Sequence, residues 1–200
     1  MFTMLGVDRA LDDRRPAAQF HLIGRSGMIA TKMSFLGALL VIAAVTLASA
    51  AQAASIRILA LGASNTNGKG VGSEQAWPAV LERMLRAKGY DAAVTVNAAN
   101  GITSAAILGS VDSAVTPGTQ VVIFDLGKAN DRKRNVSPEE TRANRAQIEA
   151  RIRAHGARPI SAPYQGASRQ QDGQHLSAEG HAQVAARVVP MVIAAAGGRR

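Results

Sequence analysis

The chain contains the three residue types that together perform nucleophilic catalysis: a serine, a histidine and an aspartate. Ser64 lies in the segment Gly62–Thr66, where a predicted strand gives way to a glycine-rich turn. Asp172 and His175 belong to the sequence Asp-Gly-Gln-His, just before the last predicted helix. In a Ser-His-Asp set the histidine takes the proton of the serine hydroxyl, and the aspartate holds the histidine ring. Taken alone, Asp-x-x-His is more often a surface turn.

Two further loops carry small polar residues directly after predicted strands. Asn97–Gly101 has the sequence NAANG, and Gly127–Asp131 has the sequence GKAND. In a parallel α/β sheet, ligands bind beyond the carboxyl ends of the strands, so we expect these loops to meet the Ser64 segment at one edge of the sheet. Each loop alone is also compatible with an ordinary turn, because Gly, Asn and Asp favour turn conformations.

The glycines that follow Ser64 raise the alternative of a phosphate-binding loop. The Walker pattern is G-x-x-x-x-G-K-[ST], but here Gly68-Lys69 is followed by Gly70. The position five residues before Gly68 is Ala63 rather than glycine. These two mismatches argue against a P-loop, whose final Ser or Thr hydroxyl binds Mg²⁺.

Strand and helix patterns alternate from residue 55 onward, and these elements must position the polar loops. Short apolar runs that are typical of buried strands cover residues 55–61, 92–97, 120–126 and 157–162. Helical patterns cover residues 74–88, 103–115, 137–155 and 177–196. Their alternation with short loops predicts an α/β fold, a three-layer α/β/α sandwich around a central parallel sheet.

Several helix ends are marked by capping residues. Ser137, Pro138 and Glu140 have the types expected for an N-cap, a first-turn proline and a capping-box glutamate. Gly89 stands where a left-handed residue commonly follows a helix. The last helix carries His181, which we expect to be a helix residue rather than a second catalytic base.

The first quarter of the chain has the pattern of an export signal. An uncharged apolar run, Phe35–Ala51, follows Lys32 and leads into the A-x-A cleavage sequence Ala51-Gln52-Ala53. We therefore expect residues 1–53 to be an N-terminal extension with a signal peptide, residues 54–200 to be the functional domain, and the product to be periplasmic or secreted. An uncleaved signal anchor is the alternative, although a run of about 17 residues is short for a bilayer core of about 30 Å.

Composition narrows the possible classes of function. The absence of cysteine excludes disulfides, thiolate catalysis and cysteine-ligated metal sites, and the four histidines show no HExxH spacing. The net charge of +9 is compatible with nucleic-acid binding, but aromatic residues make up only 4% of the chain and no long basic block is present. We therefore predict no metal, no organic cofactor and no nucleic-acid partner.

Together, the four polar segments resemble the blocks of the SGNH hydrolases, the GDSL-type esterase and lipase superfamily. The final sequence DGQHLSAEGH, residues 172–181, is similar to the family's DGxHLxxxG ending. The resemblance covers the chain from Ile56 to the last helix. Carried over to this sequence, the family's serine, glycine, asparagine and Asp-His pair fall on Ser64, Gly101, Asn130, Asp172 and His175.

This resemblance implies an SGNH or flavodoxin-like fold and an exported serine hydrolase that cleaves ester or thioester bonds of small acyl substrates. Ser64, Asp172 and His175 would form the catalytic triad. Ser64, Gly101 and Asn130 would form the oxyanion hole, with no cofactor or metal. The implied partner is a small-molecule acyl ester or thioester, the membrane is met only transiently through the signal peptide, and the oligomeric state is left open.

Three departures from the family pattern support an alternative, a catalytically impaired SGNH-like binding module. Ala63 stands where the family usually has an aspartate that could brace the nucleophile loop. The second block is one residue short, and Ile102 follows Gly101 where an aspartate is common. The third block reads GKAND rather than GxND, which leaves the register of Asn130 open.

Overall fold

The computed structural model describes residues 55–197, so the predicted signal-peptide region lies outside the described residues. Four strands form one sheet in the order β2-β1-β3-β4, and each pair of neighbours is parallel. The strands are β1 (Ile56–Gly62), β2 (Ala92–Ala98), β3 (Val121–Phe124) and β4 (Arg158–Ser161). The predicted parallel sheet is therefore confirmed, with strand ends within a few residues of those expected from the sequence.

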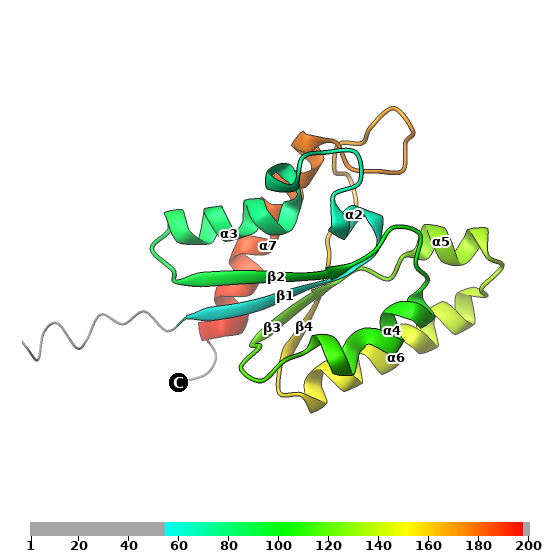
Figure 1. Ribbon diagram of the computed structural model, residues 1–200, viewed down its shortest axis with the longest axis horizontal. Coiled ribbons are helices and arrows are strands. Elements are labelled where there is room, and N and C mark those ends of the chain that lie inside the picture. The colour runs from blue at the N-terminus through cyan, green and yellow to red at the C-terminus, as the bar shows by residue number, and fades with distance from the viewer. Residues whose placement is uncertain (1–54, 198–200) are drawn as a thin grey trace, which may run out of the picture. The chain divides into compact units, whose positions relative to one another are not determined.

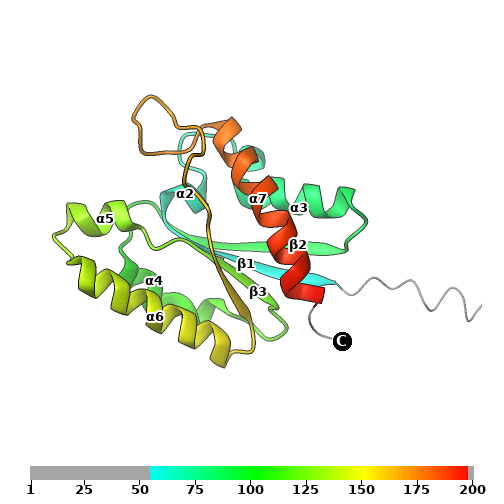
Figure 2. The same ribbon diagram turned by 180° about the vertical axis from the view of Figure 1, so that it is seen from behind.

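Helices cover both faces of this sheet, as Figures 1 and 2 show. The helical elements are α2 (Ser64–Asn67), η2 (Ser73–Gln75), α3 (Trp77–Ala87), α4 (Ser104–Ala114), α5 (Lys128–Lys133), α6 (Pro138–Ala154) and α7 (Ala178–Gly197). Helices α3 and α7 pack together on one face, while α4 and α6 pack together on the other. This arrangement confirms the three-layer α/β/α sandwich. Among residues 55–197, no helix is long and apolar enough to cross a membrane.

The side chains of β1 divide the interior into two hydrophobic cores. Ile56, Ile58 and Ala60 belong to the core between the sheet and the α3–α7 layer. Leu59 and Leu61 belong to the core between the sheet and the α4–α6 layer. Successive strand residues point to opposite faces. A strand with helices on both faces therefore has an almost continuous apolar sequence, as β1 does.

The capping signals of the sequence are confirmed at two helix ends. After α3, the N–H of Gly89 donates to Arg86 O (2.9 Å) and the N–H of Tyr90 donates to Leu85 O (3.1 Å). This is the hydrogen-bond pattern of a Schellman motif, which requires the left-handed φ of +83° that Gly89 adopts. At the start of α6, Ser137 Oγ accepts a hydrogen bond from the N–H of Glu140 (3.0 Å).

The structure differs from the sequence-based expectation at the predicted helix 74–88. A 3-10 turn, η2, is separated from α3 by Ala76, whose backbone is extended. Pro78 lies in the first turn of α3, where its missing N–H costs no helical hydrogen bond. A helix that began at residue 74 would need the N–H of residue 78 as a donor to Glu74 O, and Pro78 has none, so the helix begins at Trp77.

Two short helices, α2 and α5, occupy segments that the sequence analysis treated as loops. They contain four and six residues, which is too short to show the 3.6-residue hydrophobic period that identifies a helix in sequence. Both follow directly on the carboxyl ends of strands, α2 after β1 and α5 after β3. The two segments that carry Ser64 and Asn130 are therefore helical and not irregular.

His181 lies in α7 and is fully buried, which confirms that it is a helix residue. Its Nδ1 accepts a hydrogen bond from the N–H of Trp77 (3.1 Å), the first residue of α3. Its Nε2 has no hydrogen-bond partner among the described residues. Burial lowers the pKa of His181 to about 4, because the imidazolium form would lose its hydration.

We expect acid to destabilise the fold through His181. An unfolded histidine has a pKa near 6.5, so the unfolded chain binds more protons than the folded chain between that value and about 4. The free energy of unfolding should therefore fall as the pH drops through this window, by up to about 3 kcal/mol for this group. Urea denaturation at a series of pH values measures the effect.

His181→Gln retains an acceptor for the Trp77 N–H but does not titrate, and it should flatten the pH dependence between 6.5 and 4. His155→Gln is the comparison variant, because His155 lies at the end of α6 near the surface, where its Nε2 pairs with Asp112 Oδ1 (3.0 Å) and is not buried as His181 is. An unchanged pH dependence in His181→Gln would show that other groups cause the acid sensitivity.

Candidate active site

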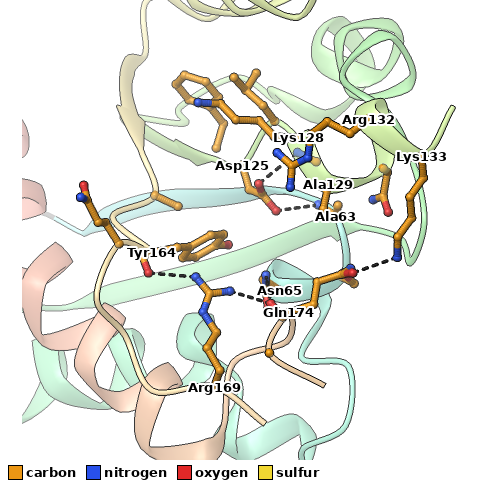
Figure 3. A pocket seen from close by; sticks show the side chains of 18 of the residues that line it. Ala63, Asn65, Asp125, Lys128, Ala129, Arg132, Lys133, Tyr164, Arg169 and Gln174 are labelled. Carbon is orange, nitrogen blue, oxygen red and sulfur yellow. Dashed lines mark hydrogen bonds between the residues drawn. The ribbon is translucent and has the colours of Figure 1, made fainter. Parts of the chain in front are cut away.

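The polar loops singled out in the sequence lie beyond the carboxyl ends of the strands. A cavity of about 780 Å³ opens there, within the size range of small-molecule sites. Its walls come from the start of α2, from the segment between β3 and α5 with α5 itself, and from the segment between β4 and α7, as Figure 3 shows. Ser64, Asn130 and Asp172 all line this cavity.

Ser64 is the first residue of α2, immediately after β1 and Ala63. Its Oγ lies 3.2 Å from Nε2 of His175, although the two residues are 111 positions apart in the chain. Ser64 is 6% exposed and His175 is 7% exposed, so the contact is shielded from solvent. This is the distance that a general base needs to accept the proton of a serine hydroxyl.

Asp172 holds the other side of the His175 ring. Its Oδ2 lies 2.5 Å from His175 Nδ1, and its Oδ1 accepts hydrogen bonds from the N–H groups of Gln174 and His175 (both 2.9 Å). The side-chain bond to His175, followed by these two backbone bonds, holds the pKa of Asp172 well below its usual range. The carboxylate is therefore ionised, and it leaves Nε2 of His175 to face Ser64.

Asn65 connects the serine segment to the histidine segment. Its Oδ1 accepts a hydrogen bond from the N–H of Leu176 (2.9 Å), and its Nδ2 donates to Gln174 O (3.5 Å). These bonds fix the two sides of the Ser64–His175 contact relative to each other. The sequence analysis did not assign a role to Asn65, and its position directly after the serine was the available signal.

Asp125 supplies a brace for the nucleophile loop, which lacks the usual aspartate at Ala63. It follows β3, and its Oδ2 accepts a long hydrogen bond from the N–H of Ala63 (3.4 Å). Its Oδ1 accepts one from the N–H of Gly127 (3.0 Å), the residue before α5. Burial raises the pKa of Asp125 despite these bonds. The sequence signal that we missed is a carboxylate directly after the apolar run VVIF.

Asn130 faces the cavity from α5 and is 8% exposed. Its Nδ2 donates one hydrogen bond to Ile102 O (2.9 Å), and an amide nitrogen carries a second hydrogen that can be donated elsewhere. The third block forms the helix α5, which begins directly after Gly127, whose φ is +62°. The departure from GxND therefore leaves Asn130 at the cavity wall.

Asp131 performs a different task from its neighbour. It is 1% exposed; its Oδ1 accepts from the N–H of Ser104 (2.8 Å), and its Oδ2 accepts from Thr141 Oγ1 (2.8 Å). These bonds connect α5 to the start of α4 and to α6. Asp131 does not line the cavity, so its contacts within the described residues are those of a structural residue.

Gly101 lies in the loop after β2, with a left-handed φ of +77°. This loop is tied to α2 by a hydrogen bond from Asn67 Nδ2 to Asn100 Oδ1 (3.1 Å), so it lies beside the serine helix. Gly101 itself is not among the residues that line the cavity. Its role as an oxyanion donor therefore stays a prediction.

Within residues 55–197, no group of three His, Cys, Asp or Glu side chains converges on one point. The arrangement that is present can remove a proton from a serine, stabilise the resulting imidazolium and present amide donors to a nearby oxyanion. These are the requirements of acyl transfer through a covalent serine intermediate.

Comparison with known sequences agrees with this geometry. The model of the GDSL-like lipase/acylhydrolase family matches residues 60–197. Esterase TesA of Pseudomonas aeruginosa is 31% identical over 110 residues, which cover 54% of this chain and 54% of that relative. The match therefore spans about half the length of the curated relative.

Three solved structures with the same fold are similar to this chain. A crystal structure of TesA is 22% identical with a TM-score of 0.61, covering 70% of this chain and 99% of that one. AlinE4, described as an SGNH-hydrolase family esterase, is 25% identical with a TM-score of 0.50, covering 72% and 80%. The psychrotrophic esterase EstA from Pseudoalteromonas sp. is 16% identical with a TM-score of 0.51, covering 71% and 94%.

Proposed function

This chain belongs to the GDSL-like lipase/acylhydrolase family, and from that premise we propose that it is a serine hydrolase that cleaves carboxylic ester or thioester bonds of small acyl substrates. The observation that carries the proposal is the hydrogen-bonded series from Ser64 through His175 to Asp172. The distances are 3.2 Å between Ser64 Oγ and His175 Nε2, and 2.5 Å between His175 Nδ1 and Asp172 Oδ2. The series lies at a cavity large enough for a small ester.

In the acylation step, Ser64 Oγ attacks the carbonyl carbon of the substrate while its proton passes to His175 Nε2. The tetrahedral intermediate then breaks the bond to the leaving oxygen or sulfur, which takes the proton back from His175. In the second step, a water molecule gives its proton to His175 and attacks the acyl-enzyme. The bond between Ser64 Oγ and the acyl carbon then breaks, Ser64 Oγ takes the proton from His175 Nε2, and the free acid is released. Asp172 stays ionised throughout and stabilises the imidazolium.

The negative charge on the carbonyl oxygen needs donors on one side of the cavity. We propose the N–H of Ser64, the side-chain amide of Asn130 and the N–H of Gly101. The first N–H of a helix has no acceptor inside the helix, and Ser64 begins α2. Each donor of this kind typically contributes about 3 to 4 kcal/mol to stabilising the transition state.

The decisive experiment combines turnover with covalent labelling. The purified domain should hydrolyse p-nitrophenyl esters, and a fluorophosphonate probe should label one serine. A series of acyl chain lengths, together with an acyl thioester, would define the preferred substrate. The alternative, a non-catalytic binding module, rests on Ala63 and the altered blocks. It predicts neither turnover nor labelling.

We further propose that residues 1–53 are an N-terminal extension with a signal peptide and that residues 54–200 are the catalytic domain, periplasmic or secreted. The expectation rests on Lys32, the apolar run Phe35–Ala51 and the ending Ala51-Gln52-Ala53. N-terminal sequencing of exported protein should begin close to Ala54. A product that keeps the apolar run and stays in the membrane fraction would instead support a signal anchor.

A further inference from the structure

The wall of the cavity beside Ser64 carries more basic than acidic side chains. Its wall includes the basic side chains Lys128, Arg132, Lys133 and Arg169. It also includes two carboxylates, both already engaged. Asp172 is bound to His175, and Asp125 accepts hydrogen bonds from Ala63 and Gly127.

Two of these cations form no salt bridge in the part of the chain that the structure describes, although Lys128 is near enough to Asp125 to favour the ionised form of that carboxyl. Neither Lys128 nor Arg132 makes an ion pair among residues 55–197. Both belong to α5, where Lys128 is two residues before Asn130 and Arg132 is two residues after it. Figure 3 shows both on the same side of the cavity, next to Asp125.

The other two basic residues contact neutral oxygens only. Arg169 donates to Gln174 O (2.6 Å) and Tyr164 O (3.1 Å), and Figure 3 shows its guanidinium reaching toward the cavity opposite Lys128 and Arg132. Lys133 donates to Gln174 Oε1 (2.8 Å). Carbonyl oxygens orient these cations but do not cancel their charge, so the cavity retains a positive field.

The cavity is also a poor match for a long hydrocarbon chain. Its large aliphatic or phenyl side chains are Phe124 and Leu126, which are only 1% and 4% exposed. The Tyr164 hydroxyl at the wall lies within hydrogen-bond distance of Thr66 Oγ1 (2.9 Å) and Trp77 Nε1 (3.1 Å), so its polar end is occupied by the protein. Phe124 and Leu126 therefore offer little surface to an acyl chain.

We infer that the substrates are small esters or thioesters that carry an anionic group, a carboxylate or a phosphate, and that Lys128 and Arg132 bind this group. The ester or thioester cleavage in this inference rests on the proposed function. The binding of an anionic group by Lys128 and Arg132 does not depend on it. A guanidinium and an ammonium on one helix provide several donors for a single anion.

Hydrolysis of two esters of equal chain length tests the inference. Mono-p-nitrophenyl adipate carries a terminal carboxylate, whereas p-nitrophenyl hexanoate is neutral. The ratio of kcat/KM for adipate to that for hexanoate should fall about threefold in Lys128→Gln, threefold in Arg132→Gln and tenfold in the double variant, because both side chains are solvent-exposed. The control Lys88→Gln/Arg142→Gln removes two positive charges outside this cavity and should keep the ratio.

A binding measurement keeps the inference testable without catalysis. Calorimetry with free adipate and with glycerol 3-phosphate should detect binding to the wild-type protein and weaker binding to Lys128→Gln/Arg132→Gln. The tighter ligand identifies the carboxylate or phosphate class. No ester turnover together with charge-dependent anion binding would refute the hydrolase but support the anion site. An unchanged adipate-to-hexanoate ratio, or equal anion binding by both proteins, would overturn the inference and leave the hydrolase intact.

Discussion

Ser64→Ala should abolish fluorophosphonate labelling and lower kcat for p-nitrophenyl esters by about 10⁴- to 10⁶-fold, the range seen when a nucleophile is removed from a serine triad. The physical reason is that the covalent path needs an oxygen at the position 3.2 Å from His175 Nε2. Without that oxygen, only transition-state stabilisation by the remaining donors is left. The rate is measured as the release of p-nitrophenol at a saturating concentration of the ester.

Folding must be separated from chemistry in this experiment. The Ser64 hydroxyl contributes one hydrogen bond, worth about 1 kcal/mol, so the melting temperature should move by only a few degrees. Ser113→Ala is the matched control, since Ser113 is an exposed serine whose hydroxyl bonds to Ser110 O within α4. Activity of Ser64→Ala equal to that of the parent would end the assignment of the nucleophile.

Asn130→Ala should lower kcat by about 10²- to 10³-fold with a much smaller change in KM. One hydrogen of the Asn130 amide is used by Ile102 O, and the other is the one we assign to the oxyanion. A donor that bonds mainly the charged transition state affects kcat, whereas a donor that bonds the ground state equally would affect KM. Steady-state kinetics on the preferred p-nitrophenyl ester separates the two.

The hydrogen bond to Ile102 O also contributes to the stability of the fold, so a matched buried asparagine is needed as a control. Asn144 is 7% exposed, compared with 8% for Asn130, and its amide donates to Ser104 Oγ (2.9 Å) outside the cavity. Asn144→Ala should lower the melting temperature but keep kcat. A near-parental kcat in Asn130→Ala would remove Asn130 from the oxyanion hole and strengthen the binding-module alternative.

Some features of the molecule follow from residues close together in the chain. The strands were predicted from apolar runs, and the α6 cap was predicted from Ser137 and Glu140, three residues apart. The Asp172–His175 pair was found for the same reason, because a three-residue spacing lets the carboxylate turn back onto the ring. Such features depend on local hydrogen bonds and on the period of a helix or strand, which the order of residues determines directly.

The candidate triad needed one step more, because Ser64 and His175 are 111 residues apart. Family resemblance predicted that they meet, and the parallel sheet explains it, since consecutive parallel strands end at the same edge. The sequence did not predict the short helices α2 and α5 at the same edge, because four and six residues are too few to show a helical period. The register of Asn130 was left open by its sequence, and the structure shows that this residue lies in α5 at the cavity wall.

Other features exist only in the tertiary structure. Asp125 braces Ala63 across 62 residues, and Asn65 holds the His175 segment through Leu176 across 111 residues. The basic wall likewise combines side chains of α5 with Arg169 from the segment before α7. No spacing in the chain encodes these contacts, because they depend on which loops the packing of two helix layers brings together above the sheet. The residue types needed for the proposed chemistry are therefore written in the sequence, while the brace that replaces the missing aspartate and the charge of the cavity arise from the fold.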